Sequence, residues 1–171
     1  MKAAHDAPPR WLDRGQQRSW RAYLDGNARL LDALDREHDA HLSVSLPEYE
    51  VLVRLSESPE GALRMSVLAD GLAYSRSRTT HTVRRMEDRG LVRRGAVAGD
   101  GRGIVCSLTD AGRSMLEAEA PAHVAAVRRY LVDVLTDDEL AALGGIMAKV
   151  AQGCAADPAS RGPSSAKSLG D

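Results

Sequence analysis

The chain has 171 residues, of which 23 are basic and 24 acidic, and it contains no phenylalanine. This length predicts one domain, whose core must be built mostly from Leu, Val, Ala and Met. The apolar runs are far shorter than a membrane span and the start shows no signal peptide, so we expect a soluble, cytoplasmic protein with no membrane partner. Its two cysteines, Cys106 and Cys154, form no CxxC pair, which argues against a disulfide framework or a structural zinc site.

Charge is unevenly distributed along the chain. The segment 62–108 carries nine arginines and four acidic residues, a net charge of +5. The remainder carries a net charge of −6, so the near-neutral total hides a basic middle. A basic segment inside an acidic frame is typical of a protein whose partner is a polyanion.

A long amphipathic helix is the first predicted element. Apolar side chains and one histidine recur at helical spacing from Trp20 to Leu42. A second helix begins at the motif SLPE, because Ser45 can cap it and Glu48 can bond back to the cap. The motif SPEG, residues 58–61, ends this second helix.

Two short helices with a tight link are predicted next. The first covers 65–72, and the second follows Ser75, which is a good N-cap, and runs to about Asp88 before Gly90. One face of the second helix is expected to point inward and carries Thr79, Val83 and Met86. The opposite face is polar and basic, and it carries Ser77, His81, Arg84, Arg85 and Asp88, with Arg78 at its edge.

A β-hairpin follows, since LVRRGAV and IVCSL are short β-branched runs on either side of GDGRG, residues 99–103. Its inner face is expected to carry Ile104, Cys106 and Leu108. A nucleotide-binding glycine loop is the alternative for GDGRG, but such a loop needs a helix directly after it. A strand follows here, so the glycines are better explained as residues of a hairpin turn with positive φ.

Helices resume at Thr109. A stripe of apolar residues runs from Leu116 to Val134, and the motif TDDE, residues 136–139, is a capping box for a last helix. In that last helix Leu140, Leu143, Met147, Val150 and Cys154 alternate at spacings of three and four. Such a narrow apolar seam is typical of helix-on-helix packing and predicts an obligate homodimer.

Two short helices followed by a hairpin form a winged helix-turn-helix, which places its second helix in the major groove of DNA. The planar fork of arginine suits guanine there. Arg102 at the hairpin tip is expected to enter the minor groove, and Asp100 to orient an arginine. The predicted DNA-binding residues are Ser75, Arg76, Ser77, Arg78, Thr80, His81, Arg84, Arg85, Asp100 and Arg102.

The segments LADGLAYSRSRTTHTVRRMEDRGLVRR and DGRGIVCSLTDAGR resemble the MarR family of winged-helix transcription regulators. The most specific mark is Asp100-x-Arg102 followed by Leu108-Thr109-x-x-Gly112-Arg113. The resemblance implies a mainly α fold with a two- to three-stranded wing and an intertwined homodimer that binds a palindrome. It also implies a small ligand, often phenolic, that releases DNA.

The resulting domain prediction has three parts. Residues 1–14 and 155–171 are expected to be a disordered arm and tail, because they are rich in Ala, Pro, Ser and Gly. The structured region 15–154 divides into a winged helix-turn-helix at 46–108 and dimerisation helices at 15–45 and 109–154.

A ligand pocket is expected between the first, second and fifth helices, although the same side chains would also suit simple packing. The candidate lining residues are Trp20, Tyr23, Leu24, His38, His41, Tyr49 and Leu52. If the protein were a metal-responsive regulator, His38 and His41 would be the metal ligands, with Glu37 or His123 nearby. The favoured prediction is that the protein binds no metal and no cofactor. A cysteine oxidation sensor is not favoured, because neither cysteine lies near the first helices.

The predicted function is therefore a sequence-specific regulator that binds double-stranded DNA, more often a repressor than an activator, and not an enzyme. Two alternatives remain at this point. One is a small enzyme that uses the glycine-rich loop for a nucleotide, and the other is a winged-helix module that binds protein.

Overall fold

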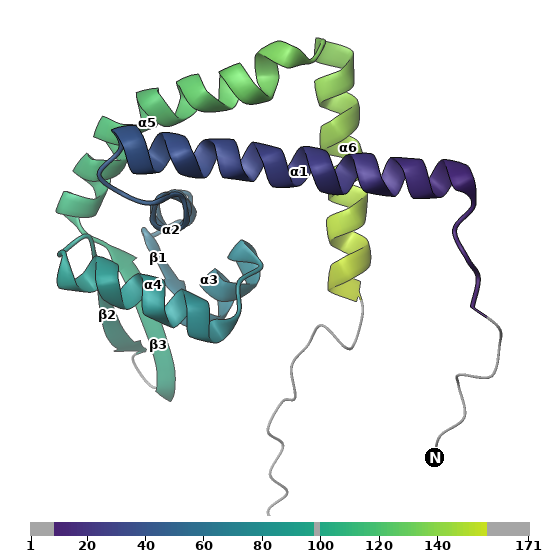
Figure 1. The fold of residues 1–171 in the computed structure, drawn as a ribbon. Coiled ribbons are helices and arrows are strands. Elements are labelled where there is room, and N and C mark those ends of the chain that lie inside the picture. Colours follow the sequence, from purple (N-terminus) through teal and green to yellow (C-terminus); the bar gives the residue numbers. More distant parts are fainter. Residues whose placement is uncertain (1–8, 98–99, 157–171) are drawn as a thin grey trace, which may run out of the picture. The chain divides into compact units, whose positions relative to one another are not determined.

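The computed structural model describes residues 9–97 and 100–156, without the side chains of 97 and 100–102. Most of the arm and tail predicted at 1–14 and 155–171 therefore lies outside the described residues. The described parts depart from that prediction at their ends, because the first helix begins at Arg14 and the last helix continues to Ala156. The described chain is mainly helical with one small sheet, as predicted (Figure 1). The elements are α1 (Arg14–His41), α2 (Leu46–Ser56), β1 (Ala62–Arg64), α3 (Met65–Leu72), α4 (Arg76–Asp88), β2 (Val92–Val97), β3 (Asp100–Leu108), α5 (Asp110–Tyr130), a 3-10 turn (Val132–Val134) and α6 (Asp137–Ala156).

The described residues form two compact units, one up to Val127 and one from Arg128. Among the described helices, none combines the length and the hydrophobicity that a membrane span requires.

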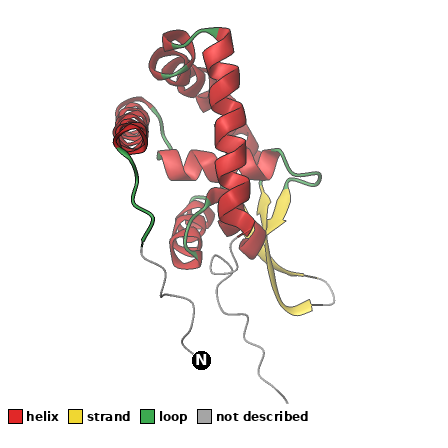
Figure 2. Cartoon of the chain, turned by 90° about the vertical axis from the view of Figure 1, so that its right-hand side faces the viewer, coloured by secondary structure: helices red, strands yellow, loops and turns green. Residues whose placement is uncertain are grey.

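The sheet has three antiparallel strands in the order β1-β3-β2 (Figure 2, yellow). β2 and β3 form the predicted hairpin, in which Val92 pairs with Leu108 and Arg94 with Cys106. β1 pairs Leu63 with Cys106 on the other side of β3. This third strand has only three residues and no periodic signal of its own, so its pairing with β3 is a tertiary property.

The hairpin connection is shorter than expected. Only residues 98–99 lie between the strands, and most of GDGRG belongs to β3. Ala96 pairs with Ile104 whereas Val97 pairs with Asp100, so residues 101–103 bulge out of the ladder. Ile104, expected on the inner face, is 50% exposed, while Cys106 is fully buried. The core cluster includes Cys106 but not Ile104, which lies nearer the tip.

The core of the first unit joins α2, α3 and α4 to the base of the hairpin. Leu52, Leu55, Leu68, Val83 and Met86 are all at most 1% exposed and belong to one cluster. A smaller cluster connects α1, α2 and α5 through Leu34, Leu46 and Ala126. These two clusters hold the short helices in a fixed arrangement and leave one face of α4 in solvent.

The junction between the hairpin and α5 explains the LTxxG motif. Thr109 Oγ1 lies 2.7 Å from Gly90 O and 2.9 Å from Leu91 O, and it accepts a bond from the Gly112 N–H at 3.0 Å. A Cβ on Gly112 would lie 2.1 Å from Leu91 O. In this motif Thr109 therefore caps α5, and Gly112 allows the start of α5 to approach the backbone of Leu91 closely.

In the second unit, α6 begins with the predicted capping box. Thr136 N–H donates to Glu139 Oε2 at 2.9 Å, and Glu139 N–H donates to Thr136 Oγ1 at 3.3 Å. The preceding helix was expected to continue to Val134, but α5 ends at Tyr130 and a 3-10 turn follows. The β-branched valines 132 and 134 favour helix less than neighbouring residues, and the cap at Thr136 starts a new helix directly after them.

Candidate nucleic-acid interface

The link between α3 and α4 is a tight turn with defined caps. Ala73 ends α3 in the left-handed conformation, with φ +52°, and the Tyr74 N–H donates to Ala69 O at 3.2 Å. Ser75 then caps α4, because its Oγ accepts a bond from the Arg78 N–H at 3.2 Å. This turn fixes the start of α4 relative to α3, as a helix-turn-helix requires.

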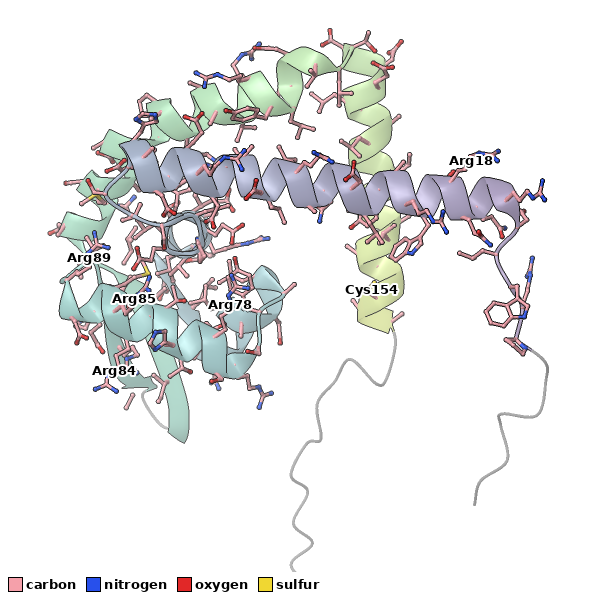
Figure 3. All side chains as sticks on the ribbon, viewed as in Figure 1. Arg18, Arg78, Arg84, Arg85, Arg89 and Cys154 are labelled. Carbon is pink, nitrogen blue, oxygen red and sulfur yellow. The ribbon has the colours of Figure 1, made fainter. Side chains whose placement is uncertain are left out.

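The two faces of α4 are those predicted from the sequence. Thr79, Val83 and Met86 are at most 1% exposed. Thr82 is also buried, at 6%, which sequence reasoning missed. The predicted contact residues of this segment are all exposed, and Figure 3 labels three of its arginines. These exposed residues are Ser75, Arg76, Ser77, Arg78, Thr80, His81, Arg84 and Arg85.

A buried carboxylate holds the carboxyl-terminal end of α4. Glu48 is 3% exposed, and its two oxygens accept bonds from Arg85 Nη2 at 2.9 Å and Arg89 Nη1 at 3.1 Å. Burial alone would raise the pKa of Glu48, but bonds from the Ser45 N–H and from Arg85 outweigh it and hold the pKa below its usual value. Arg89 also donates to Ser43 O at 2.8 Å. The ion pairs therefore tie α4 to the start of α2.

The amino-terminal end of α4 has a different anchor. The guanidinium carbon of Arg78 lies 3.9 Å from the centre of the Tyr74 ring. The Tyr74 hydroxyl donates to Glu50 Oε2 on α2. Neither Tyr74 nor Glu50 was singled out in the sequence as part of the site, because only the folded α2 brings Glu50 to the turn.

Other arginines of the basic segment differ in how much of their charge is compensated. Arg94 is paired with Glu87, with Nη2 and Oε2 2.6 Å apart. Within the described residues, Arg76, Arg84 and Arg93 form no ion pair and are exposed. Figure 3 shows Arg84 on the side of α4 away from α2. These three cations are free to meet phosphates or base edges.

Two predicted DNA-binding residues, Asp100 and Arg102, lie in the wing, and the structure describes only their backbone. Asp100 and Arg102 belong to β3, and Arg102 lies in the bulge between the partners of Ala96 and Val97. Their side chains lie outside the described residues, so the predicted pairing of Asp100 with an arginine stays a prediction.

The seven predicted pocket residues do not meet in one place within the described chain. Trp20, Tyr23 and Leu24 lie in the amino-terminal half of α1 and are 52%, 41% and 45% exposed. His38, Tyr49 and Leu52 are buried, and Leu52 belongs to the main core cluster. A shallow surface depression over α2, β1 and α3 contains none of the seven.

His38 is a satisfied core histidine. Its Nδ1 lies 3.0 Å from Val44 O, and its Nε2 lies 3.0 Å from His123 Nδ1. Burial, and then the neighbouring His38, lower the pKa of His123, whose ring also packs 4.2 Å from that of Tyr49. His41 is exposed instead, with Nε2 3.9 Å from Glu37. Across the described residues no group of three or more metal-ligating side chains comes together.

The cysteines differ in environment. Cys106 is fully buried, and burial followed by the charge of Glu87 raises the pKa of its thiol to about 12. A thiol with so high a pKa is a poor nucleophile, because the thiolate is the reactive form. Cys154 is exposed near the end of α6.

A capped helix-turn-helix, an exposed arginine-rich second helix and a following hairpin define a winged-helix protein of the DNA-binding class. The chain belongs to the MarR family: the family's model matches residues 42–103. It is similar to AbsC, a MarR family regulator of Streptomyces coelicolor, at 36% identity, covering 87% of this chain and 100% of that one, with a TM-score of 0.79.

It is also similar to Sco3205, a MarR family regulator of the same organism solved in complex with DNA. Identity is 41% over 87% of this chain and 93% of that one, with a TM-score of 0.80. CouR of Rhodococcus jostii, solved with p-coumaroyl-CoA, shares the fold at 22% identity over 73% and 85% of the two chains, with a TM-score of 0.64. No curated protein matches the chain.

Proposed function

We propose that this regulator binds double-stranded DNA sequence-specifically through α4 and represses transcription. The observation that carries the proposal is the front of α4, where exposed arginines project from a helix whose other face is locked into the core. Such a helix lies in the major groove, where side chains on its exposed face reach base edges. Arg78 and Arg84 are the residues we assign to base edges, and Arg76 and Arg93 to phosphates.

The wing supplies the second part of the proposed interface. Arg102 lies near the tip of the hairpin, where a cation can enter the narrow minor groove. The minor groove carries a degenerate base pattern, so this contact adds affinity more than sequence preference. The Sco3205–DNA complex supports a DNA-binding role for this fold at 41% identity.

We further propose that the active form is a homodimer. Among the described residues of the single chain, none in α6 is buried, although Leu140, Leu143 and Met147 lie along one side of that helix. The exposed Trp20, Tyr23, Leu24 and Leu31 leave a second apolar face on α1. A second copy would cover such faces, and two-fold symmetry then requires inverted half-sites about 10 bp apart, or a multiple of that spacing.

Release by a small phenolic ligand is a further proposal. CouR, which shares the fold, was solved bound to p-coumaroyl-CoA, whose acyl group carries a phenol, and this supports a phenolic effector. The lining residues would be Trp20, Tyr23 and Leu24 with His38, His41, Tyr49 and Leu52, which a dimer could bring together. A DNA-binding regulator acts where the chromosome lies, so we propose a cytoplasmic location.

The test is selection of bound duplexes from random DNA at one stated salt concentration. We expect a selected site with a dyad. Arg84→Ala should weaken binding to that site by about five- to 150-fold, because one good base contact is worth about 1–3 kcal/mol. Arg18→Ala is the matched control, because it removes the same charge from the start of α1, away from α4 (Figure 3).

A selected site without a dyad would contradict the dimer, and equal losses in both variants would contradict base contact by Arg84. Weak binding to DNA, with no sequence preference and little salt dependence, would favour the alternative that this winged helix binds a protein.

A further inference from the structure

Within the described residues, Tyr74 forms the one cation–π contact with an arginine of α4. It lies in the turn directly before the Ser75 cap, so its backbone position is set by the same turn that starts α4. Figure 3 labels Arg78 at this end of the helix. The pair therefore lies where a recognition helix first meets the bases.

The stack leaves Arg78 able to bind. The guanidinium carbon lies over the ring, 3.9 Å from its centre, which is within the range of a cation–π contact. Arginine donates its hydrogen bonds in its own plane, while its face can stack on an aromatic ring. A guanidinium whose face is occupied by Tyr74 can still offer its edge to two acceptors of one guanine.

The Tyr74 ring is itself held in place by a hydrogen bond to α2. The Tyr74 hydroxyl donates to Glu50 on α2, and burial, followed by that hydrogen bond, raises the pKa of Tyr74 to about 12. The hydroxyl therefore remains a donor at any physiological pH. Because α2 belongs to the same core as α4, the ring has a fixed position relative to the helix that it serves.

We propose that Tyr74 is a positioning residue that sets the direction of Arg78 and thereby the base preference at one position of each half-site. The proposal rests on the proposed function, in which α4 reads bases. An unstacked arginine would lose more rotamer freedom on binding than one already held in place. Tyr74 acts here through Arg78 and contacts no base itself.

The experiment is a double-mutant cycle on the full chain, measured against the selected operator and against variants with one base pair changed. Tyr74→Leu should lower operator affinity by about two- to fivefold, the range expected for an exposed cation–π contact. It should weaken preference at the same base pair as Arg78→Ala and at no other. In the Arg78→Ala background it should have no further effect.

Tyr74→Phe is the matched control, since it keeps the ring and removes only the hydroxyl; it should retain base preference within about twofold. Equal weakening by Tyr74→Leu on every duplex, or effects that add to those of Arg78→Ala, would overturn the proposal. If Arg78→Ala itself changed no base preference, the assignment of Arg78 to base edges would fail instead, and the proposal with it.

A measurement on the unsubstituted protein covers the case in which Tyr74→Leu does not fold. The Arg78 side-chain N–H resonance, assigned by its loss in Arg78→Ala, should be shifted upfield by the Tyr74 ring both free and bound to DNA. An ordinary resonance position in the complex would show that the stack breaks on binding, and would refute the proposal.

Discussion

Replacing Gly112 by alanine should destabilise the protein, although alanine favours helix. The added Cβ would lie 2.1 Å from Leu91 O and 2.9 Å from Leu108 Cδ1. The closer atom belongs to the backbone, so no side-chain rotation relieves the contact. The start of α5 and the end of the α4–β2 link must instead separate by about 1 Å.

The magnitude follows from opposing terms. Alanine gains about 1 kcal/mol over glycine inside a helix. Forcing a packed interface apart costs about 1–3 kcal/mol. The same movement stretches the bonds from Thr109 N–H to Leu91 O, at 3.2 Å, and from Gly112 N–H to Thr109 Oγ1, at 3.0 Å. Each is worth about 1 kcal/mol, so we expect a net loss of about 2–4 kcal/mol in the free energy of unfolding.

Urea unfolding at one fixed protein concentration measures this loss, because a dimer's stability depends on concentration. Gly26→Ala is the matched control: Gly26 lies inside α1, and a Cβ there meets nothing within 4 Å. That substitution should be neutral or stabilising by up to about 1 kcal/mol. If Gly112→Ala were as stable as Gly26→Ala, the close approach to Leu91 would not explain the glycine.

Three other predictions concern charge and assembly. Glu48→Gln should destabilise by about 1–3 kcal/mol at pH 7. The folded state holds the pKa of Glu48 low, so this stabilisation is present above the unfolded pKa and is lost as pH falls through the folded pKa. Unfolding measured at pH 7 and at successively lower pH should therefore show the difference between wild type and variant narrowing in acid. A difference independent of pH would refute the ion-pair explanation. Arg102→Ala should weaken operator and scrambled duplex by similar factors and lower the salt slope of binding by about 1, and an unchanged slope would remove Arg102 from the DNA interface. Deleting residues 136–171 should leave an unstable or aggregating lobe by light scattering, whereas a folded, DNA-binding monomer would disprove the obligate dimer.

Much of the fold could be predicted because its signals are local. Ser75 and Gly90 mark the two ends of α4 through capping and a positive φ, and the structure has this helix at Arg76–Asp88. The capping box at Thr136 likewise predicted the start of α6. Helical period alone separated the buried face of α4 from its exposed arginines, because successive turns repeat within a few residues.

The partners of those side chains depend on tertiary structure. Glu48 was visible only as a helix cap, yet it pairs with Arg85 and Arg89, about 40 residues further along the chain. The bond between His38 and His123 spans 85 residues. The sequence therefore determined which face of α4 meets solvent, whereas folding alone decided which arginines remain free, because long-range packing of α2 against α4 supplies or withholds each counter-charge.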